Sequence, residues 1–210
     1  MSLIAGRYQL LEASRPGAPQ RARDLETAQT VLLRDVPLPI EGADEVLERA
    51  RTAKGVFHPS LVTLFDVVLQ PGWRVLLAYE FVPAQSILQL SGGHPFNPKR
   101  AAEIMTEVAD AAAELHARGL AHGGISQTTV LVTMKGKAKL DRVADPSLNI
   151  LAEPSIEGDI AALGDLLKAL VGKPASSGVA GLQAIETIIE RVRAGRFESA
   201  ATFAAMLRRR

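Results

Sequence analysis

The chain of 210 residues contains no cysteine. This absence excludes disulfides and thiol chemistry, and it is typical of proteins from a reducing compartment. Long apolar runs are also missing: the longest, such as "VLLAYEFV", are much shorter than the ~18 residues expected of a membrane span. We therefore expect a cytoplasmic protein without a membrane span in this chain, or the cytosolic part of a larger membrane-anchored protein.

Aromatic residues are scarce, at 4%, and neither sign of charge dominates. The 24 lysines and arginines nearly balance the 23 aspartates and glutamates, which leaves a formal net charge of +1. Few aromatic rings means few platforms for stacking bases, and balanced charge provides no field that attracts a polyanion. We therefore expect no nucleic-acid partner. Hydrophobic residues make up 47% of the chain, which indicates a globular protein with a core.

Short apolar runs separated by turn residues dominate the first 80 or so residues. "RYQLLEA" and "TVLLRDVPL" are typical of strands, and "SLVTLFDVVLQPGWRVLLAYEFV" predicts a hairpin around Pro71-Gly72. Between these strands, "ADEVLERARTAKG" has helical spacing. Four of its apolar residues share one face: Val46, Leu47, Ala50 and Ala53. The sequence therefore predicts a small sheet with one helix in this part.

The character of the chain changes after Pro83. "NPKRAAEIMTEVADAAAELHARGL" predicts an amphipathic helix with Asn97 as its N-cap, Pro98 at its first position and Gly119 as its C-cap. "TTVLVT" and "AKLDRV" around "MKGK" predict a second small hairpin. Three more helices are expected in "GDIAALGDLLKALVG", "GLQAIETIIERVRAG" and "SAATFAAMLRRR", the last with Ser199 as its cap, whereas "ASSGVAG" at 175–181 is expected to be a loop.

The order of these elements, together with several short words, resembles the eukaryotic-like Ser/Thr protein kinases of bacteria. "GRYQLLE" resembles the first strand of that family, and "ARDLETAQTVLLRDV" its second and third strands, with "VLLR" in place of "VAIK". "HPSLVTLFDV" is similar to the "HPNIV" segment, and "LLAYEFV" to the fifth strand and hinge. "LHARGLAHGGISQTTVLVTMKGKAKLDRV" resembles the catalytic and metal-binding stretch without a gap. "GDIAALGDLLKALVG" and "RFESAATFAAML" resemble the anchoring and closing helices of the large lobe.

The resemblance covers the chain from Gly6 to about Leu207 and implies an α+β, protein-kinase-like bilobal fold. Residues 1–82 would form a small antiparallel β lobe with one helix, together with the hinge. Residues 83–210 would form a mostly helical large lobe, and the two lobes together would make one domain. Only about ten residues separate Arg142 from "AEP" at 152–154, where the family has "APE", so the activation segment and the substrate-docking region would be truncated. The family's pairing of that glutamate with a late arginine, here Arg196, is then in question.

Several positions that hold ATP in the family differ here. The phosphate-covering loop corresponds to "ASRPGAPQ", where Gly17 lies between prolines that have no N–H to offer a phosphate. The lysine of the third strand corresponds to Arg34, and its glutamate partner on the helix corresponds to Arg49, so the family's ion pair cannot form. A shift of one residue would supply Glu48 instead, with a rotation of the helix by about 100°. Tyr79 corresponds to the residue that guards the back of the adenine pocket and narrows it.

The catalytic loop departs furthest from the family. Its His-Arg-Asp triplet corresponds to His122-Gly123-Gly124, so Gly124 occupies the position of the general base and offers no carboxylate. The lysine two residues later corresponds to Ser126, and the asparagine that binds the second metal ion corresponds to Thr129.

The metal-binding triplet corresponds to Arg142-Val143-Ala144, and an arginine repels Mg²⁺. A shift of one residue would place Asp141 there instead. Two residues that support the fold are retained: His122, which packs beneath the loop in the family, and Asp159, which holds the loop backbone.

The resemblance therefore implies a pseudokinase, which is a catalytically inactive scaffold or regulatory module in signalling. We expect a protein partner, such as a kinase or another signalling protein, or a second copy of the chain as a homodimer. No cofactor is expected, neither ATP nor Mg²⁺, and the four histidines show no metal-ligand spacing. Two alternatives stay open: a nucleotide or anion sensor that uses Arg34 and Arg142 without Mg²⁺, and an unconventional phosphotransferase with Asp141 or Asp145 as its base.

Overall fold

The computed structural model describes residues 3–12, 17–148, 153–172 and 182–209. Three predicted features lie wholly or partly outside these ranges: the first residues of the turn "ASRPGAPQ", the alanine of "AEP" and the loop 175–181. The chain is α+β, as predicted, and forms two compact units. The sheet unit contains Met1–Phe57, Val62–Val82 and Arg142–Ala152. The helical unit contains His58–Leu61, Pro83–Asp141 and Glu153–Arg210.

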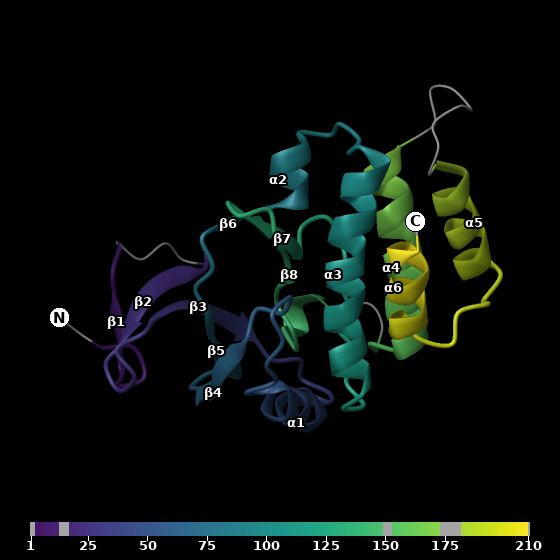
Figure 1. The fold of residues 1–210 in the computed structure, drawn as a ribbon. Coiled ribbons are helices and arrows are strands. Elements are labelled where there is room, and N and C mark those ends of the chain that lie inside the picture. Colours follow the sequence, from purple (N-terminus) through teal and green to yellow (C-terminus); the bar gives the residue numbers. More distant parts are fainter. Residues whose placement is uncertain (1–2, 13–16, 149–152, 173–181, 210) are drawn as a thin grey trace. The chain divides into compact units, whose positions relative to one another are not determined.

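The sheet unit is built on an antiparallel sheet with the strand order β1-β2-β3-β5-β4 (Figure 1). The strands are β1 (Tyr8–Leu10), β2 (Gln20–Asp24), β3 (Thr30–Pro37), β4 (Leu64–Gln70) and β5 (Arg74–Glu80). The predicted hairpin around Pro71-Gly72 is confirmed, since it joins β4 to β5. Strand β5 is buried at five consecutive positions, which explains its continuous apolar sequence.

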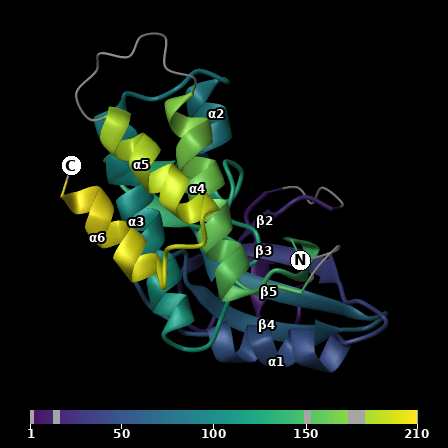
Figure 2. The ribbon, with the colours of Figure 1, turned by 90° about the vertical axis from the view of Figure 1, so that its right-hand side faces the viewer.

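One helix, α1 (Ala43–Ala53), packs next to β4 in this unit (Figure 2). Its buried residues include all four of the predicted apolar face: Val46, Leu47, Ala50 and Ala53. The predicted helix and its apolar face are thus confirmed. A short 3-10 turn, η1 (Pro146–Leu148), contacts β3.

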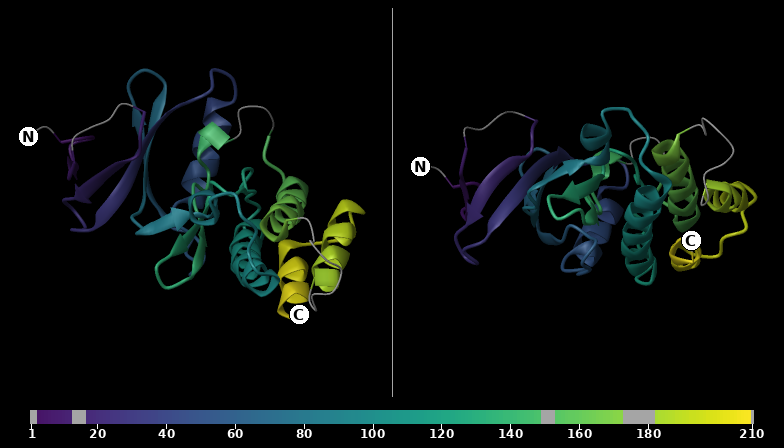
Figure 3. Two further views of the ribbon diagram at one scale, coloured as in Figure 1. Left: turned by 90° about the horizontal axis from the view of Figure 1, so that it is seen from above. Right: turned by 45° about the horizontal axis from the view of Figure 1, so that its top comes forward.

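The helical unit combines a small sheet with a group of helices. The sheet has the order β6-β7-β8. Its strands are β6 (Ala84–Ser86), β7 (Val130–Thr133) and β8 (Ala138–Leu140). The helices are α2 (Ile87–Ser91), α3 (Pro98–His116), α4 (Ile156–Val171), α5 (Leu182–Arg193) and α6 (Ala200–Arg208). Helix α3 packs against α4, α6 and β8, and α4 packs against α5 (Figure 3).

Helix α3 organises this unit because its apolar stripe is completely buried. The predicted stripe residues are Ile104, Val108, Ala111, Ala112 and Leu115, each 0% exposed. The Asn97 side chain accepts the Lys99 N–H at 2.9 Å and Pro98 follows it, which confirms the predicted start of the helix. The predicted end is wrong by two residues: the C-cap is Ala117, and Gly119 follows with a φ of +70°.

Elsewhere in the helical unit, Ser199 accepts the Thr202 N–H at 3.1 Å, so the predicted cap of α6 is also confirmed. Among the described residues, no helix has both the length and the apolar composition that a membrane crossing requires.

Candidate functional site

The loop between α3 and β7 is held in place by a carboxylate from α4. Asp159 is 1% exposed. Its Oδ2 accepts the His122 N–H at 2.7 Å, and its Oδ1 accepts the Gly123 N–H at 2.8 Å. The prediction that Asp159 holds the loop backbone is therefore confirmed. Because the buried His122 N–H and the partly buried Gly123 N–H need acceptors, this carboxylate fixes the loop at the point where it leaves α3.

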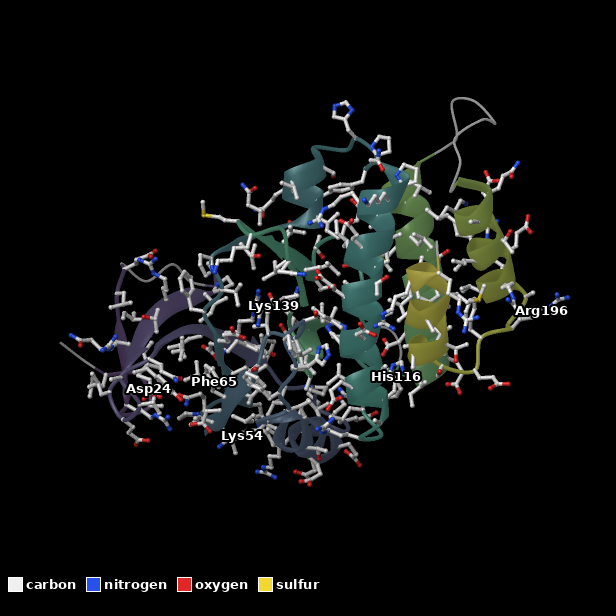
Figure 4. The ribbon with its side chains drawn as sticks, in the orientation of Figure 1. Asp24, Lys54, Phe65, His116, Lys139 and Arg196 are labelled. Carbon is white, nitrogen blue, oxygen red and sulfur yellow. The ribbon has the colours of Figure 1, made fainter. Side chains whose placement is uncertain are left out.

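A third donor reaches the same carboxylate from the end of α3. His116 places its Nε2 2.9 Å from Asp159 Oδ2 (Figure 4). This residue was missed in the sequence, although a signal was present. His116 follows Ala112 by four residues and so continues the stripe that includes Ile104 and Val108. A polar residue that extends an apolar stripe indicates a buried polar contact.

His122 is buried beneath the loop, as predicted, and both of its ring nitrogens are engaged. Its Nε2 lies 2.8 Å from the carbonyl oxygen of Asp141, which can only accept, so Nε2 carries the hydrogen. Its Nδ1 accepts the Gly124 N–H at 3.2 Å. These contacts specify the neutral imidazole protonated on Nε2, and they give His122 a supporting role in the loop.

The structure brings Gly124 and Thr129, two of the predicted site residues, into direct contact. Thr129 is 0% exposed, and its hydroxyl donates to the Gly124 carbonyl at 2.7 Å. The same oxygen accepts the Ser126 N–H at 2.9 Å. Because a hydroxyl has a single hydrogen, the donor capacity of Thr129 is fully used within the loop. Gly123 has a φ of +75°, which favours glycine, whereas Gly124 is not left-handed, so its backbone does not demand glycine.

Two more predicted positions, Arg34 and Arg49, lie in the sheet unit. Arg34 is half-buried on β3, opposite Leu77 of β5, and Arg49 is half-buried on α1. The alternative residue, Glu48, has a side chain that is 73% exposed and lies 3.7 Å from Arg51. Within α1, therefore, Arg49 lies closer to the buried face than Glu48.

Arg142, also in the sheet unit, bonds to its own segment. Its Nε donates to Asp145 Oδ2 at 2.8 Å, and its Nη2 donates to Ser147 Oγ at 2.6 Å. The Asp145 side chain is 0% exposed. Asp141, the alternative at the metal position, belongs to the helical unit and is buried, and its N–H donates to the Thr129 carbonyl at 2.8 Å.

Tyr79, the residue predicted to guard the adenine pocket, is completely buried on β5. Its hydroxyl donates to the Val143 carbonyl at 2.8 Å, within the sheet unit. The ring thus connects β5 to the segment that carries Arg142. Arg196 lies between α5 and α6 with an exposed side chain, and it forms no ion pair in the part of the chain that the structure describes (Figure 4).

A network of charges in the sheet unit was not predicted. Arg7 donates to both oxygens of Asp24, at 2.7 and 2.6 Å, and these hydrogen bonds lower the pKa of Asp24 and raise the pKa of Arg7. Asp66 accepts from Tyr8 at 3.1 Å and from Lys54 at 2.6 Å. Burial alone would raise the pKa of Asp66, but the hydrogen bond from Lys54 helps to lower it. Each anion in this network has a cation beside it, and the network links β1 and β2 to β4, the strand at the opposite end of the sheet order.

No family model matches the chain. Over 142 residues, or 68% of its length, it is 25% identical to the serine/threonine-protein kinase pkn2 of Myxococcus xanthus. Over 145 residues, or 65% of its length, it is 23% identical to the serine/threonine-protein kinase PrkC of Bacillus subtilis. The matched segments span 17% and 22% of the lengths of these two relatives. The chain is thus distantly similar to bacterial Ser/Thr protein kinases over about two thirds of its length.

Proposed function

We propose that this chain is a pseudokinase: one bilobal kinase-like domain, with lobes at residues 1–82 and 83–210, that transfers no phosphate. It acts as a protein-binding scaffold or regulatory module in signalling, and its partner is a kinase, another signalling protein or a second copy. The distant similarity to the Ser/Thr kinases of Myxococcus xanthus and Bacillus subtilis supports the kinase-like part of this proposal. The α+β architecture with an antiparallel sheet is compatible with it.

The observation that carries the proposal is the chemistry of the loop from His122 to Thr129. Its sequence, "HGGISQTT", contains no carboxylate that could accept a proton from a substrate hydroxyl. Its polar groups bond to one another instead: the Thr129 hydroxyl to Gly124, and His122 Nδ1 to the Gly124 N–H. A loop of this kind supports the fold but offers no general base.

The donor set also does not fit Mg²⁺. Kinase chemistry depends on carboxylate and amide oxygens that hold the metal ion against the phosphates. The corresponding positions here are Thr129, whose neutral hydroxyl oxygen already accepts the Ser126 N–H, and Arg142, which carries a positive charge. We therefore expect no bound ATP·Mg²⁺, and no step of a phosphate transfer is assigned to these residues.

The sensing alternative would use Arg34 and Arg142 to bind a nucleotide without Mg²⁺. It has less support, because the Arg142 guanidinium is already bound by Asp145 and Ser147. An unconventional base at Asp145 has the same difficulty, since its Oδ1 accepts from Ser147 and its Oδ2 from Arg142.

A thermal-shift titration with ATP, with and without Mg²⁺, tests the proposal. A ligand at a hundred times its Kd stabilises the folded state by about 2.7 kcal/mol, which is easily seen as a rise in Tm. We expect no rise at millimolar ATP under either condition. A rise that needs Mg²⁺ would contradict the proposal, and a rise without Mg²⁺ that Arg142→Ala removes would favour the sensor.

A further inference from the structure

A large open groove lies on the helical unit, apart from the loop described above. Its volume is about 1040 Å³. It extends across the start of α3, which lies between the β7–β8 hairpin and the end of α6 (Figure 1). Six cationic residues line it, and we call this surface the basic groove: Lys99, Arg100, Lys135, Lys137, Arg208 and Arg209.

The acidic residues at the groove are already neutralised. Glu103 pairs with Arg100 at 3.2 Å. Glu107 pairs with Lys137 at 2.8 Å and also accepts the Ala138 N–H, and its hydrogen bond raises the pKa of Lys137.

Of the remaining cations in the groove, Arg208 pairs with Asp110. Lys99, Lys135 and Arg209 have no ion-pair partner among the residues that the structure describes. Among the described residues, the groove therefore presents three positive charges without an ion-pair partner.

Two of the groove cations occupy an unfavourable position for the helix itself. Lys99 and Arg100 lie in the first turn of α3, where the helix dipole is positive and acidic residues are preferred. That turn contains no acidic residue. Positions where a sequence departs from such a local preference are often functional. The same dipole adds to the positive potential that a bound anion would meet at the groove.

The floor of the groove is apolar. Ile185 of α5 and Leu207 of α6, which are 2% and 3% exposed, line it together with Ala102 of α3. An apolar floor with a charged rim is the usual anatomy of a protein-binding surface.

We propose that the basic groove binds an acidic segment of a protein partner, with carboxylates on the rim cations and small apolar side chains on the floor. Charge complementarity of this kind selects the partner and speeds association. This inference rests on the proposed function in one respect, since that function makes the partner a protein.

The probe is a short fluorescein-labelled peptide of alternating glutamate and alanine, and its neutral counterpart has glutamine in place of glutamate. Binding to the full chain is measured by fluorescence anisotropy at low and at physiological salt. The test variant replaces the three groove cations without an ion-pair partner among the described residues: Lys99→Ala, Lys135→Ala and Arg209→Ala. The control variant removes the same charge from exposed cations elsewhere that also have no ion-pair partner among described residues: Arg23→Ala, Lys168→Ala and Arg193→Ala.

We expect the acidic peptide to bind the unmodified chain, with an affinity that falls as salt rises. The test variant should bind about tenfold more weakly, since each exposed charge contributes a modest amount, and the control variant should bind as the unmodified chain does. Four outcomes would overturn the inference. These are no binding, equal binding of the glutamine peptide, an equal loss in both variants, or equally tight binding of single-stranded DNA or anionic lipid vesicles.

A single substitution separates binding from folding. Lys99→Glu should weaken binding of the acidic peptide but leave Tm unchanged or raise it, because a carboxylate suits the start of α3. If the Tm and the affinity for the peptide both fell, Lys99 would have a structural role, and this result would contradict the inference. The peptide assay contains no nucleotide. Failure of the peptide to bind would therefore leave the pseudokinase proposal intact. Likewise, a finding that the chain binds ATP would not account for a failure of the peptide to bind.

Discussion

At the scale of single residues, Asp159 is the centre of the candidate site. One buried carboxylate accepts from His116, from the His122 N–H and from the Gly123 N–H. The resemblance predicted Asp159 and His122, whereas for His116 the spacing along α3 indicated only a buried polar contact and not its partner. Its contact depends on α3 and α4 lying side by side, and such long-range packing cannot be read from a local pattern.

The first prediction concerns this carboxylate. Asp159→Ala leaves buried donors without an acceptor, so we expect the free energy of unfolding to fall by about 3 kcal/mol. Asp165→Ala, an exposed position on the same helix, is the matched control and should change it by less than about 0.5 kcal/mol. Urea denaturation followed by circular dichroism measures both. Equal effects of the two substitutions would show that Asp159 does not hold the loop.

The second prediction concerns pH. The hydrogen bonds from Arg7 lower the pKa of Asp24 in the folded chain, so the folded state holds this carboxylate ionised where the unfolded chain protonates it. Its contribution to stability is fully present above the ordinary aspartate pKa of about 3.9 and is lost as pH falls below that value. Asp24→Asn should therefore destabilise the chain at pH 7 and have a smaller effect in acid. A destabilisation that does not change with pH would contradict this account.

At the scale of elements, the sequence predicted those whose stability comes from a local pattern. Helices α1 and α3 follow from apolar spacing, and the β4–β5 hairpin follows from its turn residues. Strand β2 has the sequence "QRARD" and no apolar pattern, and only the resemblance indicated it. It forms because β1 and β3 pair with it on either side, and because Ala22 and Asp24 point inward. Elements β6 and α2 were missed because each is only a few residues long.

The third prediction concerns the contact between α4 and α5. A Cβ added at Gly164 would lie 2.5 Å from a methyl group of Val192, so glycine is required for the two helices to approach. We expect Gly164→Ala to destabilise the chain by about 1–3 kcal/mol through overpacking, although alanine is the better helix former. Combining it with Val192→Ala should recover part of the loss, measured as a double-mutant cycle in urea. If Gly164→Ala alone stabilised the chain, the close contact would be disproved.

At the scale of the whole molecule, the resemblance predicted an α+β chain with an antiparallel sheet, and both are present. The resemblance also predicted which positions would correspond to those where a kinase holds phosphate and metal. What it could not provide was the local contacts of these residues. Two examples are the bond from Arg142 to Asp145 and the bond from Thr129 to Gly124 that closes the loop. Both depend on backbone geometry, which the spacing of residues in the sequence does not determine.

The central claim is that this chain does not transfer phosphate, and transfer of label from γ-labelled ATP tests it most directly. The chain is incubated with Mg²⁺ or Mn²⁺ and a generic protein substrate, alongside Asp141→Asn and a protein-free blank. We predict no incorporation above the blank, because under the proposed function Gly124 takes the position of the general base and Arg142 that of a metal ligand. Incorporation that Asp141→Asn abolishes would contradict the claim and show that a kinase site persists.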